Sequence, residues 1–440
     1  MTYHNAVKYI RNAPAEPENR NGEVVQTLCR YFGDPQKKLK YLRLAGSNGK
    51  TVCAAMLTSV MKQANITVGC LTLPMREEVR DNIRIASLPL SIEETVDYAS
   101  RVCRAVQEIN RSRAEVPAKT GDAGESGEGE PQTVSLPPLV PSRSEILLVM
   151  ALLAFRDANC RLCLIESDHN GTDPSKFLPA PFAAVICGTI PSDEKQEIQR
   201  IRSYIRRGVQ EIVSAPQDRD AYQILSDTCA AVNCRLTVPS RSGLSVRKLT
   251  LRGTDFFYRG KDYSLSLCGK FQIFNALVVL ETLDMLSRHG FPVGYEAVCR
   301  GLAGVRLPGK FEVLSVMPLI IADSTHTPVA IRTVCDSMAD FREITGNKIR
   351  LFLPAGDLIG HYCQVLAALG YEIVQITVLC GKEDTPTLDG IDCPVKIYTS
   401  RKEAIRQTLA ALEKDTFLLI SGTHAFTDSV RYDLLGALGF

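Results

Sequence analysis

The chain has 440 residues, of which 45% are hydrophobic and 23% are charged, and its formal net charge is +2. A chain of this length is too long for one compact core, so we expect two domains of ordinary globular composition. The small net charge argues against a nucleic-acid binder held by bulk electrostatics, but it leaves room for a local site that binds an anionic small molecule.

The N-terminal residues and the cysteines indicate the cellular compartment in which we expect the protein. Met1–Asn5 is polar and has no apolar signal region, and no apolar run in the chain is long enough to span a bilayer. The 15 cysteines are scattered along the chain, so we expect reduced thiols in a cytoplasmic protein without a membrane partner. Cys160 and Cys163 form the only C-x-x-C pair. They straddle the start of the apolar run Leu162–Ile165, which favours a buried structural role over redox or zinc chemistry.

Strand-like and helix-like segments alternate along the first part of the chain, which predicts an α/β fold with a mostly parallel sheet. The segments are a strand at Tyr41–Ala45, a helix at Val52–Ala64, an extended segment at Ile66–Leu73, a helix at Glu145–Asn159, and strands at Leu162–Glu166 and Ala183–Gly188. The region Ala114–Ser142 is rich in glycine, acidic residues and then proline. Its few apolar groups cannot offset chain entropy, so we expect a disordered surface loop.

A break at Arg306–Gly309 is followed by a second series of alternating elements, which predicts a smaller Rossmann-like α/β domain. Its strands are expected at Leu319–Ala322, Ile349–Pro354, Glu372–Leu379 and Thr416–Ser421, and its helices at Val329–Ala339, His361–Leu369 and Arg401–Leu412. We therefore place a P-loop domain at residues 1–305 and the second domain at residues 306–440.

The strongest local signal is the segment Leu44–Thr51 (LAGSNGKT), which follows a strand and opens a helix. Glycines let the backbone approach phosphate oxygens, and amides at a helix N-terminus point at an anion. Lys50 would contact the β- and γ-phosphates of ATP, and the Thr51 hydroxyl would help to hold Mg²⁺. Leu44 stands where the common Walker A pattern has its first glycine, so a simple glycine turn with an exposed lysine is the alternative. The candidate nucleotide-binding residues of the loop are Gly46, Ser47, Asn48, Gly49, Lys50 and Thr51.

Several segments match, in order, the motifs of one known family. They are Phe32–Lys40 (FGDPQKKLK), Gly46–Thr51, Asp81–Ile85, Ser144–Ile146 with Ala154–Phe155, Glu166, Gly269–Ala276 (GKFQIFNA), Leu307–Glu312 (LPGKFE), Asp323–Pro328 (DSTHTP) and Ser421–Arg431. On these motifs the chain resembles folylpolyglutamate synthase/dihydrofolate synthase, within the Mur ligase superfamily. The likeness covers nearly the whole chain apart from the acidic loop.

The resemblance implies a Mur-ligase-like P-loop domain followed by a Rossmann-like domain, and an ATP-dependent amide-bond ligase that uses Mg²⁺. A carboxylate of a folate-like substrate would attack the γ-phosphate to give an acyl phosphate. The amine of an amino acid, usually glutamate, would then displace phosphate. Members of the family often work as monomers. A Mur-like ligase for a different acid and a catalytically silent ATP-binding protein remain as alternatives.

The resemblance also assigns nucleotide contacts in the second half of the chain. Asp323 and His326 would lie near the nucleotide and act with Lys50 as catalytic residues. The alternative makes Asp323 a helix cap and His326 an ordinary loop residue. Asn275 would lie near the adenine, although it could instead cap or brace a buried helix. Lys310 replaces a family arginine, so it keeps the positive charge but loses the planar fork.

Oxygen ligands for Mg²⁺ are expected from Thr51, Glu145 and Asp193. Glu145 matches a family ligand, but it could also be a solvated charge at a helix N-terminus. The family's histidine ligand is absent here, and Asp193 or Glu194 could supply oxygen in its place. Glu166 ends an apolar strand, where it is either a ligand or an ordinary strand-end acid.

Other departures from the family pattern cluster on the side of the acceptor substrate. A carbamylated lysine expected near Ile201 is absent. Glu166–Gly171 (ESDHNG) replaces a glycine-rich loop, and it brings in His169, either a substitute metal ligand or an exposed loop residue. Leu73–Met75 replaces an "SPHL" motif. These changes leave an altered substrate, or lost activity, open.

Overall fold

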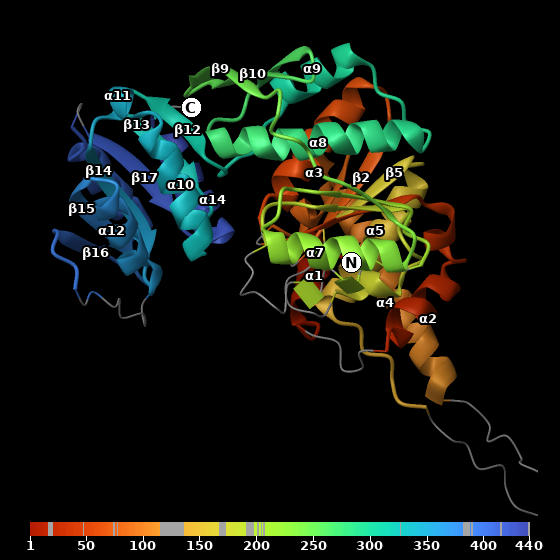
Figure 1. The fold of residues 1–440 in the computed structure, drawn as a ribbon. Helices are drawn as coiled ribbons and strands as arrows, with labels where there is room; N and C mark the ends of the chain where they lie inside the picture. The colour runs from red at the N-terminus through yellow and green to blue at the C-terminus, as the bar shows by residue number, and fades with distance from the viewer. Residues whose placement is uncertain are drawn as a thin grey trace, which may run out of the picture. The chain divides into compact units, whose positions relative to one another are not determined.

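The computed structural model describes residues 1–15, 21–46, 48–73, 75–76, 78–114, 136–166, 173–190, 198–199, 202–203, 205, 207–325, 327–381, 388, 390–413 and 416–438. The chain divides into two compact units (Figure 1). Unit 1 comprises Met1–Ala54 and Asn65–Thr237, and unit 2 comprises Ala55–Ala64 and Val238–Phe440. The predicted domain boundary at residues 305/306 stays a prediction. Within the described residues, none of the helices combines the length and apolar character needed to cross a membrane.

Unit 1 is built on a sheet in which eight strands are described, in the order β4-β3-β2-β5-β1-β6-β7-β8. From β2 to β8 all neighbours are parallel, whereas β3 and β4 add an antiparallel edge. The mostly parallel sheet that the sequence predicts is thus confirmed. The strands are β1 (Tyr41–Ala45), β2 (Val68–Thr72), β3 (Ile83–Ile85), β4 (Leu88–Pro89), β5 (Leu162–Glu166), β6 (Ala183–Ile186), β7 (Glu211–Ser214) and β8 (Arg235–Thr237).

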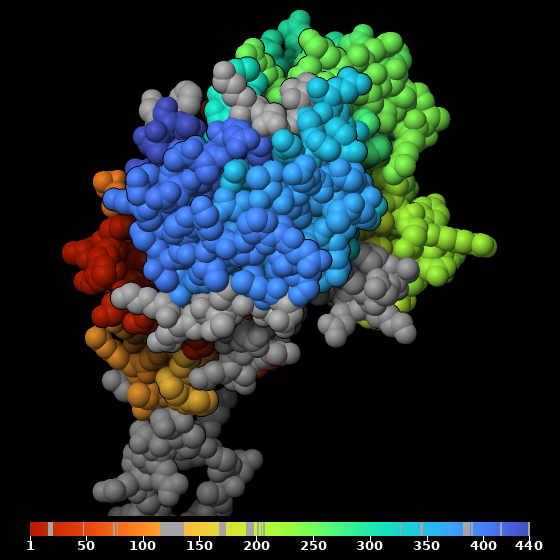
Figure 2. All heavy atoms as spheres, turned by 90° about the vertical axis from the view of Figure 1, so that its left-hand side faces the viewer, coloured from red at the N-terminus to blue at the C-terminus, as the bar shows by residue number. Residues whose placement is uncertain are grey.

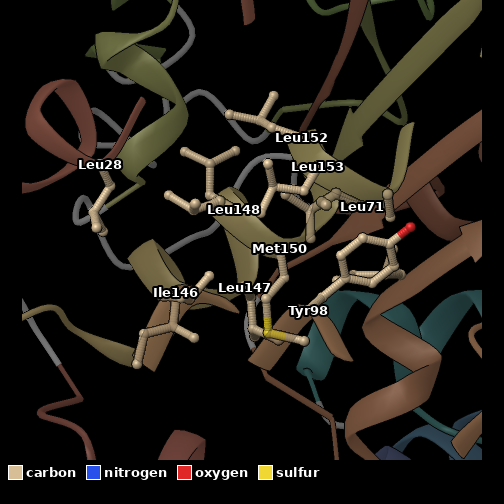
Figure 3. Close-up of a cluster of buried hydrophobic side chains, with 14 of the residues drawn as sticks. Leu28, Leu71, Tyr98, Ile146, Leu147, Leu148, Met150, Leu152 and Leu153 are labelled. Atoms are coloured by element: carbon tan, nitrogen blue, oxygen red, sulfur yellow. The ribbon is translucent and has the colours of Figure 1, made fainter. Parts of the chain in front are cut away.

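Helix α5 forms the centre of the main core of unit 1. Every residue from Ser144 to Phe155 is buried, as expected for a helix that is apolar on all sides. Figure 3 shows its leucines with Leu28, Leu71 and Tyr98, which come from α2, β2 and α4. The α-helices of this unit are α1 (Tyr3–Asn12), α2 (Glu23–Tyr31), α4 (Ile92–Ala114), α5 (Arg143–Asp157) and α7 (Arg219–Ala231), with α3 (Lys50–Gln63) shared with unit 2; the 3₁₀-helices are η1 (Pro35–Lys38), η2 (Val79–Asn82) and η3 (Pro174–Phe177).

The C-terminal part of unit 2 is a sheet with the described order β12-β13-β17-β14-β15-β16, parallel except for the edge strand β12. Helices α10 and α12 pack together on one face, and α13 and α14 pack on the other. This doubly wound arrangement confirms the predicted Rossmann-like fold. In Figure 2 the atoms of this C-terminal part, in blue, form one continuous body. The elements are β12 (Glu312–Val316), β13 (Leu319–Asp323), α10 (Pro328–Ala339), α11 (Arg342–Thr345), β14 (Lys348–Pro354), α12 (Leu358–Ala368), β15 (Glu372–Leu379), β16 (Val395–Tyr398), α13 (Arg401–Ala410), β17 (Thr416–Ser421) and α14 (His424–Leu438).

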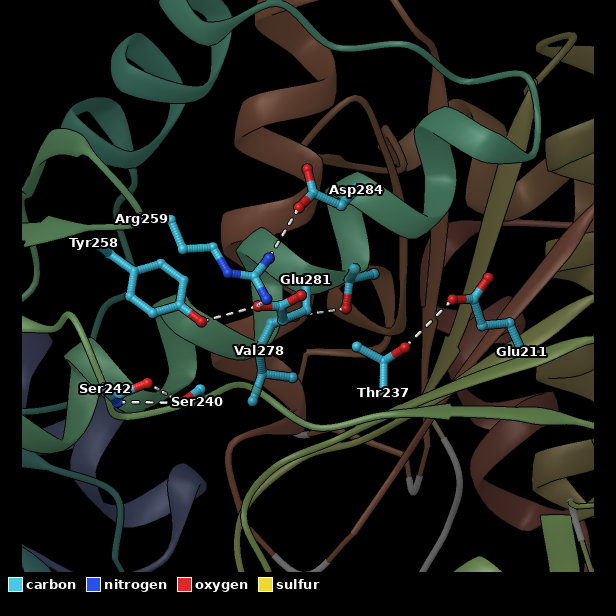
Figure 4. A network of polar contacts seen from close by, with 10 residues as sticks. Glu211, Thr237, Ser240, Ser242, Tyr258, Arg259, Val278, Glu281 and Asp284 are labelled. Carbon is cyan, nitrogen blue, oxygen red and sulfur yellow. Dashed lines mark hydrogen bonds and ion pairs between the residues drawn. The ribbon is translucent and has the colours of Figure 1, made fainter. Parts of the chain in front are cut away.

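A three-stranded antiparallel sheet, which the sequence analysis did not predict, precedes this fold in unit 2. Its elements and the two following helices are β9 (Ser245–Thr250), β10 (Gly253–Tyr258), β11 (Lys261–Leu265), α8 (Lys270–Arg288) and α9 (Tyr295–Gly304). The sheet is bonded to α8 through the buried carboxylate of Glu281. That carboxylate accepts a hydrogen bond from the Tyr258 hydroxyl at 2.9 Å and pairs with Arg259 at 2.7 Å (Figure 4).

The packing of α5 against β2 gives a test of the core. A Cβ added at Gly69 would lie 2.3 Å from Cδ1 of the buried Phe155. We expect Gly69→Ala to lower the free energy of unfolding by about 1–3 kcal/mol, because overpacking forces the ring to move. Thermal unfolding would show this as a lower midpoint. In a Phe155→Leu background there is no ring to displace, so the same substitution should cost less. An equal cost in both backgrounds would contradict this packing.

Candidate functional site

The phosphate loop lies between β1 and α3, as predicted. Gly46 and Gly49 have φ angles of 114° and 83°, a left-handed region that strongly favours glycine. A Cβ at Gly46 would lie 2.1 Å from the carbonyl oxygen of Cys187, just after β6. Lys50 is only 7% exposed, and its ammonium donates a hydrogen bond to the Gly46 carbonyl. The ammonium group of Lys50 is therefore buried within the loop. The alternative that Lys50 is an exposed lysine is wrong. Ser47 lies outside the described residues.

Glu166 joins this loop to two neighbouring strands. It is 2% exposed at the end of β5, and in the strand registers it lies opposite both Leu44 of β1 and Thr72 of β2. The Thr51 hydroxyl donates to one carboxylate oxygen at 2.9 Å, and the Thr72 hydroxyl donates to the other at 2.9 Å. Parallel strands bind ligands at their carboxyl ends, and this buried carboxylate lies at that edge of the sheet.

The pair formed by Thr51 and Glu166 has the chemistry that Mg²⁺ requires. A hydroxyl and a carboxylate are hard oxygen donors, and Mg²⁺ commonly takes one or two protein ligands while water and phosphate supply the others. In the part of the chain that the structure describes, no three His, Cys, Asp or Glu side chains gather as a metal site. Asp193, Glu194 and His169 lie outside the described residues, and the metal role of Asp193 stays a prediction.

Glu145 occupies the third position of α5 and completes a capping box. Its Oε2 accepts hydrogen bonds from the Ser142 backbone N–H at 2.9 Å and from the Ser142 hydroxyl at 2.8 Å. The residue is 1% exposed, so the alternative of a solvated helix-end charge is wrong. Burial raises the pKa of Glu145, and the hydrogen bonds from Ser142 partly oppose that rise. Its role as a metal ligand stays a prediction.

In unit 2, Asp323 holds the segment that precedes β12. One carboxylate oxygen accepts a hydrogen bond from the Phe311 backbone N–H at 2.7 Å, and the other accepts one from the Thr325 hydroxyl. Phe311 has a φ of 50°, a strained value for a bulky residue. The cap of α10 is Thr327, whose side chain accepts from the Ala330 N–H, so the alternative that Asp323 caps this helix is wrong.

The other predicted nucleotide contacts of unit 2 lie at three places. Asn275 lies in the second turn of α8, where its amide donates to the side-chain oxygen of Gln272 at 3.0 Å. Lys310 lies in the same segment as Phe311, next to Gly309, whose N–H donates to Glu312 at 2.8 Å. His326 lies outside the described residues. The nucleotide roles of these residues and of Asp323 stay predictions.

Two residues beside the phosphate loop, Thr72 and Glu166, were missed or left undecided by sequence reasoning. The role of Glu166 was left open, and Thr72 was not named. The available signal was that Glu166 ends a predicted strand and Thr72 is the second-last residue of another, because the carboxyl ends of parallel strands meet at one edge of a sheet. The order β2-β5-β1, which makes them neighbours, could not be derived from the sequence.

The capping box of Glu145 predicts how stability depends on pH. A raised pKa in the folded state means that folding favours the protonated acid. The stabilising contribution is therefore full below the ordinary glutamate pKa and is lost as pH rises through the raised value. Glu145→Gln keeps a capping side chain without the charge. The thermal midpoint of Glu145→Gln, compared with that of the unsubstituted protein at the same pH, should therefore rise as pH increases above the ordinary glutamate pKa. A difference in thermal midpoint between the two proteins that does not change with pH would contradict this account. A change in that difference when Mg²⁺ is added would support the role of Glu145 as a metal ligand.

Comparisons with known proteins bear on this site. No family model matches the chain. A probable bifunctional folylpolyglutamate synthase/dihydropteroate synthase of Halobacterium salinarum is 25% identical over 358 residues, which cover 78% of this chain but only 40% of that longer relative. The folylpolyglutamate synthase of Lacticaseibacillus casei is 22% identical over 346 residues, 75% of each chain.

The fold agrees with these relatives. A solved structure named as an FPGS-AMPPCP-folate complex superposes with a TM-score of 0.78 at 20% identity, over 99% of this chain and all of the other. The Mur-ligase-type fold predicted from the sequence is thereby confirmed. The chain is thus similar in sequence to folylpolyglutamate synthases over about three quarters of its length, and it shares the fold of the solved FPGS complex.

Proposed function

We propose that this protein is an ATP-dependent amide-bond ligase that joins an amino acid, with glutamate the first candidate, to a folate-type carboxylate. The observation that carries the proposal is the 2.9 Å contact between Thr51 and Glu166 beside the phosphate loop. It puts two oxygen ligands suited to Mg²⁺ next to the place where a triphosphate would be held. The names of the relatives, and the nucleotide analogue and folate in the similar solved complex, support the same activity.

In this proposal, the phosphate loop at residues 46–51 binds the phosphates of ATP. Its backbone amides and Lys50 would bind the β- and γ-phosphates. Thr51 and Glu166 would hold Mg²⁺, which when bound supplies positive charge against the phosphate oxygens. Because Lys50 and Glu166 are buried, their charges act in a corner of low dielectric constant, where electrostatic interactions are stronger than in water.

The reaction has two substitution steps. First, a carboxylate oxygen of the acid substrate bonds to the γ-phosphorus as the bond to the ADP oxygen breaks, which gives an acyl phosphate. Next, the amine nitrogen of the amino acid bonds to the acyl carbon, phosphate leaves, and the nitrogen loses a proton. Holding both substrates in line with the phosphate is the main task of the protein in such a reaction.

The remaining assignments are part of the same proposal. In unit 2, the nucleotide contacts would be Asn275, Lys310, Asp323 and His326, and in unit 1 Glu145 and Asp193 would be further metal ligands. The protein would work in the cytoplasm as a monomer. A ligase for a different acid is the second candidate, because Leu73–Met75 and Glu166–Gly171 depart from the family pattern while the phosphate loop is retained.

Turnover of the purified protein tests this function. ADP and phosphate should form only when ATP, Mg²⁺, a reduced folate and glutamate are all present. Lys50→Ala should weaken ATP binding roughly 10- to 100-fold, because a charged hydrogen bond to phosphate contributes about 1.5–3 kcal/mol. Isothermal titration with a non-hydrolysable ATP analogue measures this loss. Lys62→Ala is the matched control, because Lys62 is an exposed lysine in the last turn of the same helix.

Two outcomes would contradict the proposal at different levels. Unchanged ATP affinity in Lys50→Ala would remove the phosphate loop from the account. Intact ATP binding without turnover on any folate would reject the folate-specific ligase. Turnover on another carboxylic acid from a broader panel would then favour the second candidate.

A further inference from the structure

Helix α7 ends in a Schellman motif that has a cysteine at both of the positions that the motif brings together. The Cys234 backbone N–H donates to the Cys229 carbonyl oxygen at 2.9 Å, and the Asn233 N–H donates to the Ala230 carbonyl oxygen at 3.2 Å. Asn233 has a φ of 57°, the left-handed conformation with which such a helix end turns back on itself. Cys229 and Cys234 are therefore joined by a direct hydrogen bond between their own backbones.

The side chains of the two cysteines enter the same core. In a Schellman motif the side chains at these two positions commonly contact each other. Cys229 is 2% exposed and Cys234 is 8% exposed, and both belong to the buried cluster that includes Ile212 of β7 and Leu225 of α7. The two thiols are also hydrogen-bonded to each other. The sulfur atoms thus lie together just beneath the end of α7, where the intervening Asn233 is exposed.

Helices α5 and α8 end in the same motif but place bulky groups at one or both of these positions. At the end of α8, the Phe291 N–H donates to the Leu286 carbonyl oxygen at 2.9 Å. At the end of α5, the Cys160 N–H donates to the Phe155 carbonyl oxygen at 2.9 Å, so a ring stands where α7 has its first thiol. Large apolar side chains therefore satisfy the packing of this motif in the same protein. The two thiols of α7 add a chemistry that packing does not require.

The surroundings give the two thiols different roles. The hydrogen bond with Cys229 lowers the pKa of Cys234 below its ordinary value, although burial and Glu211 oppose that effect. The same hydrogen bond, followed by burial, raises the pKa of Cys229. Glu211 itself pairs with Arg235, the residue after Cys234, at 3.6 Å. Because the thiolate is the reactive form of cysteine, Cys234 is the nucleophile of the pair and Cys229 is the protonated thiol beside it.

We propose that Cys229 and Cys234 form a reversible redox site that reacts with hydroperoxides and closes to a disulfide at the end of α7. The Cys234 sulfur bonds to one oxygen of the hydroperoxide as the O–O bond breaks, which gives a sulfenic acid and one molecule of water or alcohol. The Cys229 sulfur then bonds to the Cys234 sulfur, and the sulfenic hydroxyl leaves as water with the Cys229 proton. Together the two thiols lose two electrons, which the hydroperoxide gains.

The proposed disulfide would tie the last turn of α7 to the start of β8. A dithiol reductant would reverse it by thiol–disulfide exchange. The site lies apart in sequence from the phosphate loop and does not depend on the proposed ligase function. Its test is therefore decided by the chemistry of the two sulfurs and not by turnover.

Peptide mass spectrometry of the peroxide-treated protein tests the site. Trypsin cleaves after Arg219 and Arg235, so both cysteines stay on one peptide, residues 220–235. The reduced protein is treated with hydrogen peroxide, and the remaining thiols are blocked with iodoacetamide. The peptide should then be lighter than its dithiol form by two hydrogens and should carry no alkyl group. Dithiothreitol should restore its alkylation.

Cys160 is the matched control for reactivity. It occupies the same position of the motif as Cys234, and it is 7% exposed against 8% for Cys234. Burial raises the pKa of Cys160 to about 11, so its thiolate is scarcer. During peroxide treatment, Cys234 should lose its reactivity toward iodoacetamide roughly 10-fold faster than Cys160. Equal rates, or a disulfide between Cys160 and Cys163 that forms as readily, would overturn the inference.

Variants with one of the two cysteines replaced distinguish the roles within the pair. Cys229→Ser leaves Cys234 without a second thiol, so peroxide should produce a sulfenic acid that a 1,3-diketone probe traps. In Cys234→Ser, Cys229 should be labelled roughly 10-fold more slowly, because burial disfavours its thiolate. Equal labelling of the two variants would overturn the assignment of Cys234 as the nucleophile. An unchanged thermal midpoint serves as the check that each variant is folded.

The unsubstituted protein decides the inference should either variant fail to fold. A 220–235 peptide that stays a dithiol while other cysteines are oxidised would overturn the redox site. Conversion of Cys234 to a sulfinic or sulfonic acid without any disulfide would also overturn it, because Cys229 would then not reach the sulfenic sulfur.

Discussion

The shared carboxylate of Glu166 is the interaction on which the account of unit 1 depends. A buried carboxylate is costly unless hydrogen bonds replace the water that it loses. Here the Thr51 and Thr72 hydroxyls each donate to one of its oxygens. These contacts connect the first turn of α3 with the ends of β5 and β2. They fix the phosphate loop relative to the sheet, and they hold two oxygen ligands at the edge where parallel strands bind ligands.

Unit 2 uses a carboxylate in a similar way. Asp323 ends β13 and accepts hydrogen bonds from the Phe311 backbone and the Thr325 hydroxyl, while its own carbonyl oxygen accepts from the Ser421 hydroxyl at 2.9 Å. The segment before β12 is thereby held against the carboxyl ends of β13 and β17. A residue that the sequence marks for nucleotide binding thus also stabilises the strained backbone at Phe311.

Much of the fold could be predicted from the sequence. Strands buried on both faces appear as short apolar runs, so β1, β5 and β17 have the predicted bounds. The small sheet containing β10 was missed, because its strands are half-buried and lack such runs. The phosphate loop was found because its glycines, lysine and threonine are contiguous. The partners of Glu166 depend on strand order and on contacts between distant residues, which no local pattern contains.

The position of the metal tests the central claim most directly. Crystals grown with a non-hydrolysable ATP analogue and Mn²⁺ in place of Mg²⁺ would reveal the ion by its anomalous scattering. The account predicts one peak within about 2.2 Å of both the Thr51 hydroxyl and a Glu166 oxygen, next to the phosphates in the loop. A nucleotide bound away from residues 46–51, or an ion that contacts neither side chain, would contradict it.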